Sequence, residues 1–280
     1  MDMTCIFKRI EKKYLLSESQ YEALFRGIGA HLKPDEYGRS TVLSLYLDTP
    51  DHRIIRTSLE AVDYKEKLRL RSYGTATSDS TVFLELKKKF EGIVYKRRVA
   101  MTLAEAEQYL QTGVKPFQNQ IMSEIDWSMT LYGRPKGAMI IACEREAWFD
   151  EEHPDLRLTF DRNIRYREKE LHLNRGSAGI NLLPERTVLL EVKTAGAMPL
   201  WLAKALDAEG ILPGNFSKYG AAYQQAFIDK KPLVNTIERG MKHVVNFYLN
   251  SAWRLFSRSL SALPSLCRSV RHFRSAGLVP

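Results

Sequence analysis

The stretch Tyr64-Lys65-Glu66-Lys67-Leu68-Arg69-Leu70-Arg71 alternates charged and apolar residues with a period of two. Side chains of a β-strand point alternately to opposite faces, so its cations at positions 65, 67, 69 and 71 share one face. Leu68 and Leu70 share the other face. The stretch therefore predicts a strand with one charged and one apolar face.

The same alternation recurs in several other segments. They contain Phe7, Arg9, Glu11 and Lys13; Phe83, Glu85, Lys87 and Lys89; Lys96 and Arg98; Arg157, Thr159 and Asp161; and Glu191 and Lys193. An antiparallel sheet with one solvated face would have the same pattern. However, helical segments lie between these strands and need an apolar surface to cover, which favours an apolar outer face and a charged inner face. We expect an α+β fold: a closed antiparallel β-barrel of about eight strands with a charged lumen, covered by peripheral helices.

The electrostatics of such a lumen indicate what it holds. Two like charges about 6 Å apart, at an effective dielectric constant near 20, repel by roughly 3 kcal/mol. A lumen lined by many cations is therefore strained when empty. An anion of high charge density relieves that strain, which favours a phosphate chain over a single carboxylate.

The bulk composition is that of a globular protein that attracts polyanions. The 280 residues are 44% hydrophobic and 27% charged, with a net charge of +9 and a sequence pI near 9.4. Cys5, Cys143 and Cys267 are isolated, which indicates neither a disulfide framework nor a zinc site and fits a reducing cytosol. With no signal peptide and no apolar run of about 18 residues, we expect a cytoplasmic protein, at most peripheral to the inner face of a membrane.

Strands are expected at about 4–14, 41–48, 64–73, 81–89, 91–101, 136–149, 156–167 and 186–194. Ser17 with Gln20, and Thr102 with Glu105, have the spacing of capping boxes and each predict the start of a helix. The second of these helices should end near Gly113. Further helices are expected at about 117–131, 199–209 and 217–228.

A domain boundary is predicted near Lys231-Pro232, which divides a tunnel domain at 4–228 from a tail at 231–280. The tail is rich in Lys and Arg, has Glu238 as its only acid, and interleaves aromatic residues with the cations. A basic amphipathic helix at a membrane surface would have this composition. A helix that packs on its own domain or on a partner protein would as well.

Five motifs resemble, in order, those of the VTC (vacuolar transporter chaperone) polyphosphate polymerase domain, a member of the CYTH or triphosphate tunnel metalloenzyme superfamily. They are Arg9-x-Glu11-x-Lys13-Tyr14, Lys67-Leu68-Arg69-Leu70-Arg71-Ser72-Tyr73-Gly74, Phe83-Leu84-Glu85-Leu86-Lys87, Leu190-Glu191-Val192-Lys193 and Phe216-Ser217-Lys218-Tyr219. The resemblance covers about residues 4–228. It implies a tunnel in which a nucleoside triphosphate binds and its γ-phosphate is transferred to a growing polyphosphate chain.

The resemblance also implies roles for individual cations. Catalytic roles fall to Lys13, Arg69, Arg71, Lys87, Arg157 and Lys218, and phosphate binding falls to Arg56, Lys96 and Arg145. We add Arg98 and Lys193 as phosphate-binding candidates because they lie in the same alternating strands. One departure is Asn215, since the family pattern has a second cation just before the Phe-Ser-Lys segment.

Glu191 matches the carboxylate that coordinates the divalent metal, Mn²⁺ or Mg²⁺. Such ions are often held by few protein carboxylates together with substrate phosphates. The alternative is that Glu191 pairs only with Lys193 or a nearby Arg. Glu11 and Glu85 would either bind metal as well or offset neighbouring cations.

The function expected from this resemblance is that of a metal-dependent ATP:polyphosphate phosphotransferase, with ATP and inorganic polyphosphate as its ligands. Positioning and charge neutralisation would supply most of the rate, so no Ser, Cys or His nucleophile is needed. Two alternatives stay open: a tunnel triphosphatase that uses water as acceptor, and a polyphosphate-binding module without catalysis. Specific nucleic-acid binding is not expected, because cations confined to a lumen cannot engage a duplex.

Overall fold

The computed structural model describes residues 10–60, 63–91 and 93–229, which belong to one compact unit, Met1–Val234. Its strands are β1 (Ile10–Ser17), β2 (Lys33–Asp48), β3 (Tyr64–Tyr73), β4 (Thr81–Phe90), β5 (Ile93–Thr102), β6 (Lys136–Phe149), β7 (Arg157–Arg167), β8 (Ile180–Asn181) and β9 (Thr187–Thr194). Its α-helices are α1 (Glu18–Ile28), α2 (Arg53–Leu59), α3 (Leu103–Thr112), α4 (Gln120–Leu131), α5 (Leu200–Ala208) and α6 (Lys218–Tyr223). The first part, 4–9, of the strand expected at 4–14 and the tail at 231–280 lie outside the described residues.

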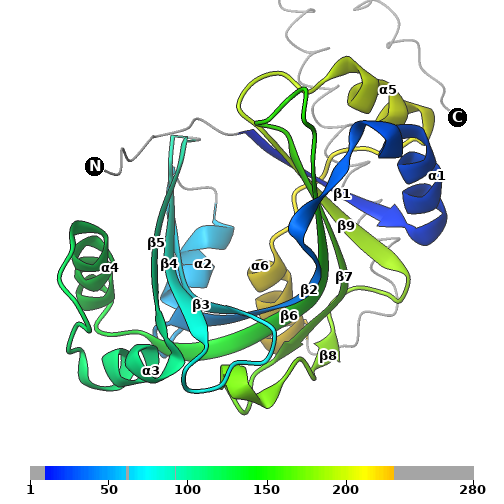
Figure 1. Cartoon of the computed structure of the whole chain (residues 1–280). Coiled ribbons are helices and arrows are strands. Elements are labelled where there is room, and N and C mark those ends of the chain that lie inside the picture. Colours follow the sequence, from blue (N-terminus) through cyan, green and yellow to red (C-terminus); the bar gives the residue numbers. More distant parts are fainter. Residues whose placement is uncertain (1–9, 61–62, 92, 230–280) are drawn as a thin grey trace, which may run out of the picture. The chain divides into compact units, whose positions relative to one another are not determined.

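The strands form one antiparallel sheet in the order β1-β9-β7-β6-β2-β3-β4-β5, with β8 paired to β7. Figure 1 shows the sheet strongly curved, with β3, β4 and β5 on one side and β1 and β9 on the other. In the described residues β1 and β5 do not pair, so the expected closed barrel is corrected to an open, curved sheet. Closure depends on strand tilt and stagger, which the alternation of residues does not encode.

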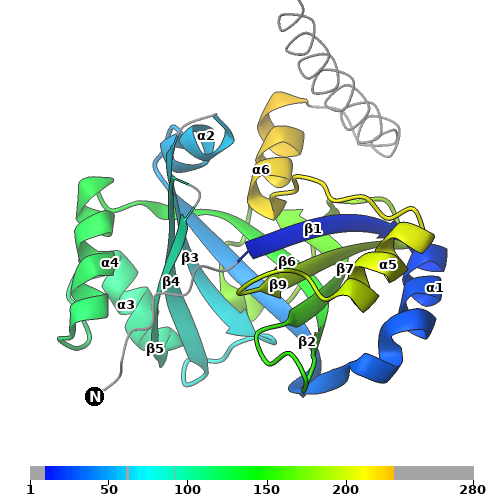
Figure 2. The same cartoon turned by 90° about the horizontal axis from the view of Figure 1, so that it is seen from above.

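The convex face of the sheet is apolar and covered by helices, as the sequence predicts. On one side, Leu68 and Leu84 pack with residues of α3 and α4, including Tyr109 and Ile125. On the other side, Leu16, Leu158 and Leu190 pack with Leu24 of α1 and Leu202 of α5. These helices lie outside the curve of the sheet in Figures 1 and 2, so the charged face is left on the concave side.

Both predicted capping boxes are present. Ser17 Oγ accepts a hydrogen bond from the Gln20 backbone N–H at the start of α1, and Thr102 does the same for Glu105 at the start of α3. Helix α3 ends at Thr112 and is capped by Gly113, whose φ of 77° lies in the left-handed region that favours glycine. The local sequence signals therefore correctly predict where α1 and α3 begin.

Helices α2 and α6 stand at the same end of the sheet (Figure 2). The Tyr219 ring of α6 stacks on Tyr46 of β2 at 4.4 Å between centroids, and its hydroxyl donates to Asp48 Oδ2 at 2.8 Å. The Asp48 carboxylate also accepts from the backbone N–H groups of Ile54 and Ile55 at the start of α2. One buried carboxylate thus joins both helices to the end of β2.

None of the helices in the described residues has the length and apolar character that a membrane crossing requires.

Candidate functional site

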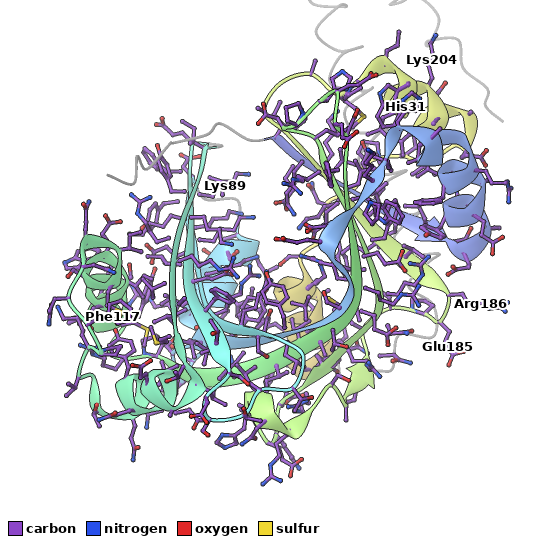
Figure 3. All side chains as sticks on the ribbon, in the orientation of Figure 1. His31, Lys89, Phe117, Glu185, Arg186 and Lys204 are labelled. Atoms are coloured by element: carbon purple, nitrogen blue, oxygen red, sulfur yellow. The ribbon has the colours of Figure 1, made fainter. Side chains whose placement is uncertain are left out.

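The concave face has two walls, which we define by their strands. The first wall is β3, β4 and β5, and the second is β1, β9, β7 and β6 together with the first residue of α6. Figure 3 shows side chains of both walls projecting into the space between them. Strand register places on the first wall Lys67, Arg69, Arg71, Lys87, Lys96, Arg98 and the acid Glu85. The second wall carries Lys13, Arg145, Arg157, Lys193, Lys218 and the acids Glu11, Asp161 and Glu191.

Three lysines of the first wall stand in one row. Lys67 of β3 lies directly opposite Lys87 of β4, which lies directly opposite Lys96 of β5. Like charges in directly opposite positions of a sheet destabilise it. The row is therefore a local concentration of positive charge that an anion would stabilise.

Glu85 offsets part of the charge of the first wall. Its carboxylate lies 2.6 Å from Arg69 Nη2, 2.7 Å from Lys96 Nζ and 3.3 Å from Arg98 Nε. Burial opposes its ionisation, but Arg69, Arg71 and Lys96 outweigh burial and hold its pKa well below the usual range. With three cations around it, this carboxylate acts in the described structure as their shared counter-ion.

Lys67 and Arg71 form no direct ion pair with a carboxylate of the described residues, although Glu85 acts on Arg71 at longer range. In the described residues, the ion pairs of the first wall involve Arg69, Lys87, Lys96 and Arg98, and none involves these two side chains. Lys67 Nζ instead donates to Ser217 Oγ at 2.8 Å, and Arg71 Nε donates to Ser44 Oγ at 3.2 Å. Burial lowers the pKa of Lys67 to about 8.

Tyr46 lies beside these cations at the base of the first wall. Arg69 Nη1 donates to its hydroxyl oxygen at 3.2 Å. Burial opposes ionisation of the phenol, but Arg69, Lys67 and Arg71 outweigh it and lower its pKa to about 8. Arg69, Lys67 and Arg71 thus concentrate positive charge at this end of the concave face.

On the second wall, Asp161 is a fully buried carboxylate held by two cations. Arg145 binds it through two hydrogen bonds, Nε to Oδ1 at 2.6 Å and Nη2 to Oδ2 at 2.7 Å. Lys218 Nζ lies 2.5 Å from Oδ2. Despite burial, Lys218 and Arg145 lower its pKa to about 2, so the carboxylate stays charged at neutral pH.

Glu191 lies next to this group and contacts four cations. Its Oε1 is 2.9 Å from Lys218 Nζ and 3.9 Å from Lys13 Nζ, and its Oε2 is 3.3 Å from Lys193 Nζ and 3.8 Å from Arg145 Nη2. Burial raises its pKa, but these cations together hold the pKa well below the usual range. The interpretation that Glu191 pairs only with Lys193 or an arginine is thus too narrow, because Lys218 is its nearest partner.

Glu11 on the edge strand β1 forms an ion pair across the concave face with β4, the neighbour of the other edge strand β5. Its carboxylate lies 3.2 Å from Lys13 Nζ on its own strand and 3.4 Å from Lys87 Nζ on β4. Burial opposes its ionisation, but Lys87, Lys13 and Lys193 lower its pKa to about 2. Like Glu85, it offsets cations in the described structure.

Two of the candidate cations lie at the margins of the site. Arg56 lies on α2, where its half-exposed side chain is 3.5 Å from Asp51. Arg157 lies at the far end of the second wall, opposite Lys193, and pairs with Asp35 at 3.6 Å. Arg56 thus lies outside the two walls, and Arg157 lies at the margin of the second.

The carboxylates of the second wall fit a divalent metal only as a partial site. The described residues contain no group of three or more His, Cys, Asp or Glu side chains that could hold a metal ion by themselves. Glu191 and Asp161 nevertheless supply charged oxygens that converge on one ammonium, that of Lys218. Mg²⁺ and Mn²⁺ accept one or two carboxylates when phosphates complete the coordination. These residues therefore fit a metal that shares its ligands with a phosphate substrate.

Sequence reasoning did not select Asp161, Lys67 or Tyr46 as site residues. Asp161 was visible in the alternation with Arg157 and Thr159, and Lys67 in the stretch that begins at Tyr64. In a sequence, an acid among the cations of a strand is indistinguishable from a member of a solvent-exposed ion pair. Only the burial of Asp161 in the structure distinguishes it from such a residue. Tyr46 carries no sequence signal, since its position beside Arg69 follows from the pairing of β2 with β3.

Several solved structures are similar to this chain at low identity. A proposed adenylate cyclase of Bacillus halodurans has 15% identity and a TM-score of 0.49, covering 79% of this chain and 99% of its own. A proposed adenylyl cyclase of Hippeastrum with a dominant triphosphatase activity has 17% identity and a TM-score of 0.45, covering 81% and 97%. The PH1819 protein of Pyrococcus horikoshii has 13% identity and a TM-score of 0.40, covering 78% and 99%. Identities this low do not carry an activity from one protein to another.

No curated protein sequence matches this chain. A family model does: the VTC domain matches residues 8–227, which is most of the chain and nearly all of its described residues. The matched residues include both walls of the concave face, among them Asp161, Glu191 and Lys218. The chain therefore belongs to the VTC domain family.

Proposed function

We propose that this protein transfers the γ-phosphate of ATP to the end of an inorganic polyphosphate chain held on the concave face. The observation that carries the proposal is the excess of cations over acids on the two walls, with the row Lys67, Lys87 and Lys96 in direct register. Such an arrangement is stabilised by a ligand that is itself a dense row of negative charge. Membership of the VTC domain family supports the same class of ligand.

The distribution of these cations favours a polymer over a single triphosphate. Lys67 and Arg71, the two cations of the first wall that form no direct ion pair in the described residues, are four residues apart on β3, which separates them by roughly 13 Å. Further cations line the opposite wall as far as Lys193 and Arg157. The cationic surface thus exceeds what one triphosphate can cover, and the remainder is available to an acceptor chain.

The residues divide into two roles in this proposal. Arg69 and Arg71 present planar guanidinium groups suited to bidentate phosphate contacts, and Lys67, Lys87 and Lys96 act as point charges along the chain. Arg145 and Lys218, held by Asp161, would neutralise charge that develops on the transferred phosphoryl group. A divalent metal at Glu191, if bound, would add Lewis-acid stabilisation of phosphate oxygens.

The test is to incubate the purified full chain with ATP and Mn²⁺ or Mg²⁺ and to resolve the products by gel electrophoresis and phosphorus NMR. Lys13→Gln and Lys12→Gln form a matched pair, because Lys13 points to the concave face and contacts Glu11 and Glu191, whereas the adjacent Lys12 is exposed on the other face. We expect wild type to make long phosphate chains. The Lys13 variant should lose most of this activity, and the Lys12 variant should keep it.

Other products would assign the protein differently. Free phosphate without chains, again lost only in the Lys13 variant, would make it a triphosphatase that uses water as acceptor. Tight polyphosphate binding without any turnover would make it a binding module. Equal loss of activity in both lysine variants would remove the concave face as the site.

A further inference from the structure

Lys218 lies between two buried carboxylates of the second wall, those of Asp161 and Glu191. Its Nζ lies 2.5 Å from Asp161 Oδ2 and 2.9 Å from Glu191 Oε1, so one ammonium serves both acids. Its side chain is only 14% exposed. The charge of Glu191 in the described structure is thus satisfied first by Lys218.

The same lysine belongs to the element that links the two walls. Lys218 is the first residue of α6, and the preceding Ser217 accepts a hydrogen bond from Lys67 of the first wall at 2.8 Å. Lys218 therefore contacts the carboxylates of the second wall and follows directly on a residue that binds Lys67 of the first wall. Its four-carbon side chain can reorient while the helix stays in place.

We propose that the Lys218 ammonium is a resident counter-ion that competes with a divalent metal for Glu191, so that metal and phosphate ligand bind together rather than in succession. The inference rests on the proposed function only in taking Glu191 as the metal ligand. A metal and an ammonium cannot both lie against Glu191 Oε1, because each carries charge that repels the other. A phosphate ligand supplies the replacement anion for Lys218 and leaves Glu191 to the metal.

Two observations favour this exchange over a lysine that merely stabilises the fold. Asp161 keeps its two hydrogen bonds from Arg145 when Lys218 moves away, so the buried carboxylate is not left without a counter-charge. Glu191 keeps a hydrogen bond from Lys193 Nζ at 3.3 Å and an ion pair with Arg145 at 3.8 Å, both on its other oxygen, Oε2. Lys218 is therefore the one close partner that has to give way at Oε1 in the described structure.

The experiment measures Mn²⁺ binding directly by electron paramagnetic resonance, without any requirement for turnover. Wild type is titrated with Mn²⁺ alone and with the non-hydrolysable ATP analogue adenylyl-imidodiphosphate, with a protein-free titration to account for Mn²⁺ bound by the analogue in solution. We expect weak binding of Mn²⁺ alone and at least about tenfold tighter binding with the analogue.

Variants of the neighbouring lysines separate competition from general charge effects. Lys218→Gln should bind Mn²⁺ alone at least about tenfold more tightly than wild type, and Lys193→Gln, which removes a cation near the other oxygen, should gain clearly less. Lys218→Arg keeps the charge and should gain nothing. Thermal unfolding of each variant checks that it is folded, and the wild-type titrations test the inference independently should Lys218→Gln not fold.

The outcomes distinguish this inference from the proposed function. If wild type binds Mn²⁺ as tightly alone as with the analogue, or if Lys218→Gln gains no more affinity than Lys193→Gln, the competition is refuted while a metal role for Glu191 survives. If Mn²⁺ binds in no condition, or if its binding persists in Glu191→Gln, the metal assignment in the proposed function is wrong and this inference is overturned with it.

Discussion

The two walls of the concave face differ in how their positive charge is compensated. The first wall has one acid, Glu85, among its cations and leaves Lys67 and Arg71 without an ion-pair partner in the described residues. The second wall combines its cations with Glu11, Asp161 and Glu191, and each of its cations has an acidic partner. The first wall is therefore suited to holding an anion, and the second to balancing charge at the place where phosphate and metal would meet.

Among substitutions that test this difference between the walls, the largest effect is expected on stability, from Asp161→Asn. Asp161→Asn keeps the shape of the side chain but leaves Arg145 and Lys218 short of one buried counter-charge. Loss of one partner from a buried ion pair costs about 3–5 kcal/mol in unfolding free energy. Denaturant-induced unfolding would measure this cost, with Asp155→Asn, on an exposed turn, expected to change stability by less than about 0.5 kcal/mol. Equal stability of Asp161→Asn and wild type would show that the pairing does not support the fold.

The second largest effect is expected on catalysis and distinguishes Glu191 of the second wall from Glu85 of the first. Glu191→Gln should lower metal-dependent ATP turnover at least about 100-fold, because it removes the proposed metal ligand. Glu85→Gln should leave the dependence on metal concentration unchanged and act mainly on substrate affinity. Steady-state kinetics at varied Mn²⁺ and ATP separate the two, with Glu185→Gln on the exposed outer surface as a control (Figure 3). A similar loss of metal dependence in both variants would remove the distinction between the walls.

A smaller effect is expected from the lysine row of the first wall. Lys87→Gln should weaken polyphosphate binding about tenfold, as expected for one lost charge-assisted contact, and should reduce the salt dependence of binding. Lys12→Gln removes the same charge from the convex face and should change neither. Isothermal titration at two ionic strengths measures both quantities. An equal loss in the two variants would mean that net charge, rather than the row, attracts the polymer.

The smallest effect is a dependence of binding on pH. Burial lowers the pKa values of Lys67 and Lys96 to about 8, so both lose charge as the pH rises through that value. Polyphosphate affinity should therefore fall several-fold between about pH 7 and 9. Lys67→Gln should flatten this dependence, and a profile that stays as steep in the variant would exclude Lys67 as its source.

The same lysine predicts a pH dependence of stability with the opposite sign. The pKa of Lys67 is lowered in the folded protein relative to 10.5 for an ordinary lysine, so the folded state releases its proton first. Its contribution to the unfolding free energy should accordingly rise as the pH increases from about 8 towards 10.5. Unfolding curves of wild type and Lys67→Gln across this range would reveal the difference.

Much of the fold was predictable from local sequence signals. The alternation in β3, β4 and β5 gave their position and their charged face, and the Ser17 and Thr102 capping boxes gave the starts of α1 and α3. Helix α2 was not predicted, because its start is held by the Asp48 carboxylate at the end of the preceding strand rather than by a side chain at its own N-cap. The open edge between β1 and β5 was likewise not predicted, since alternation is identical in open and closed sheets.

The sequence by itself determined which residues face the same way along each strand and which chemistry they carry, because a period of two is a property of the backbone. It thereby predicted the charged face that the structure shows, and it predicted a phosphate chain as ligand, which stays a prediction. Only the tertiary structure decided which charges neutralise one another: Asp161 and Glu191 share Lys218, while Lys67 keeps a serine hydroxyl as its partner. Those pairings join residues on different strands and on α6, and burial together with distances of a few ångströms sets their strength, which spacing along the chain cannot specify.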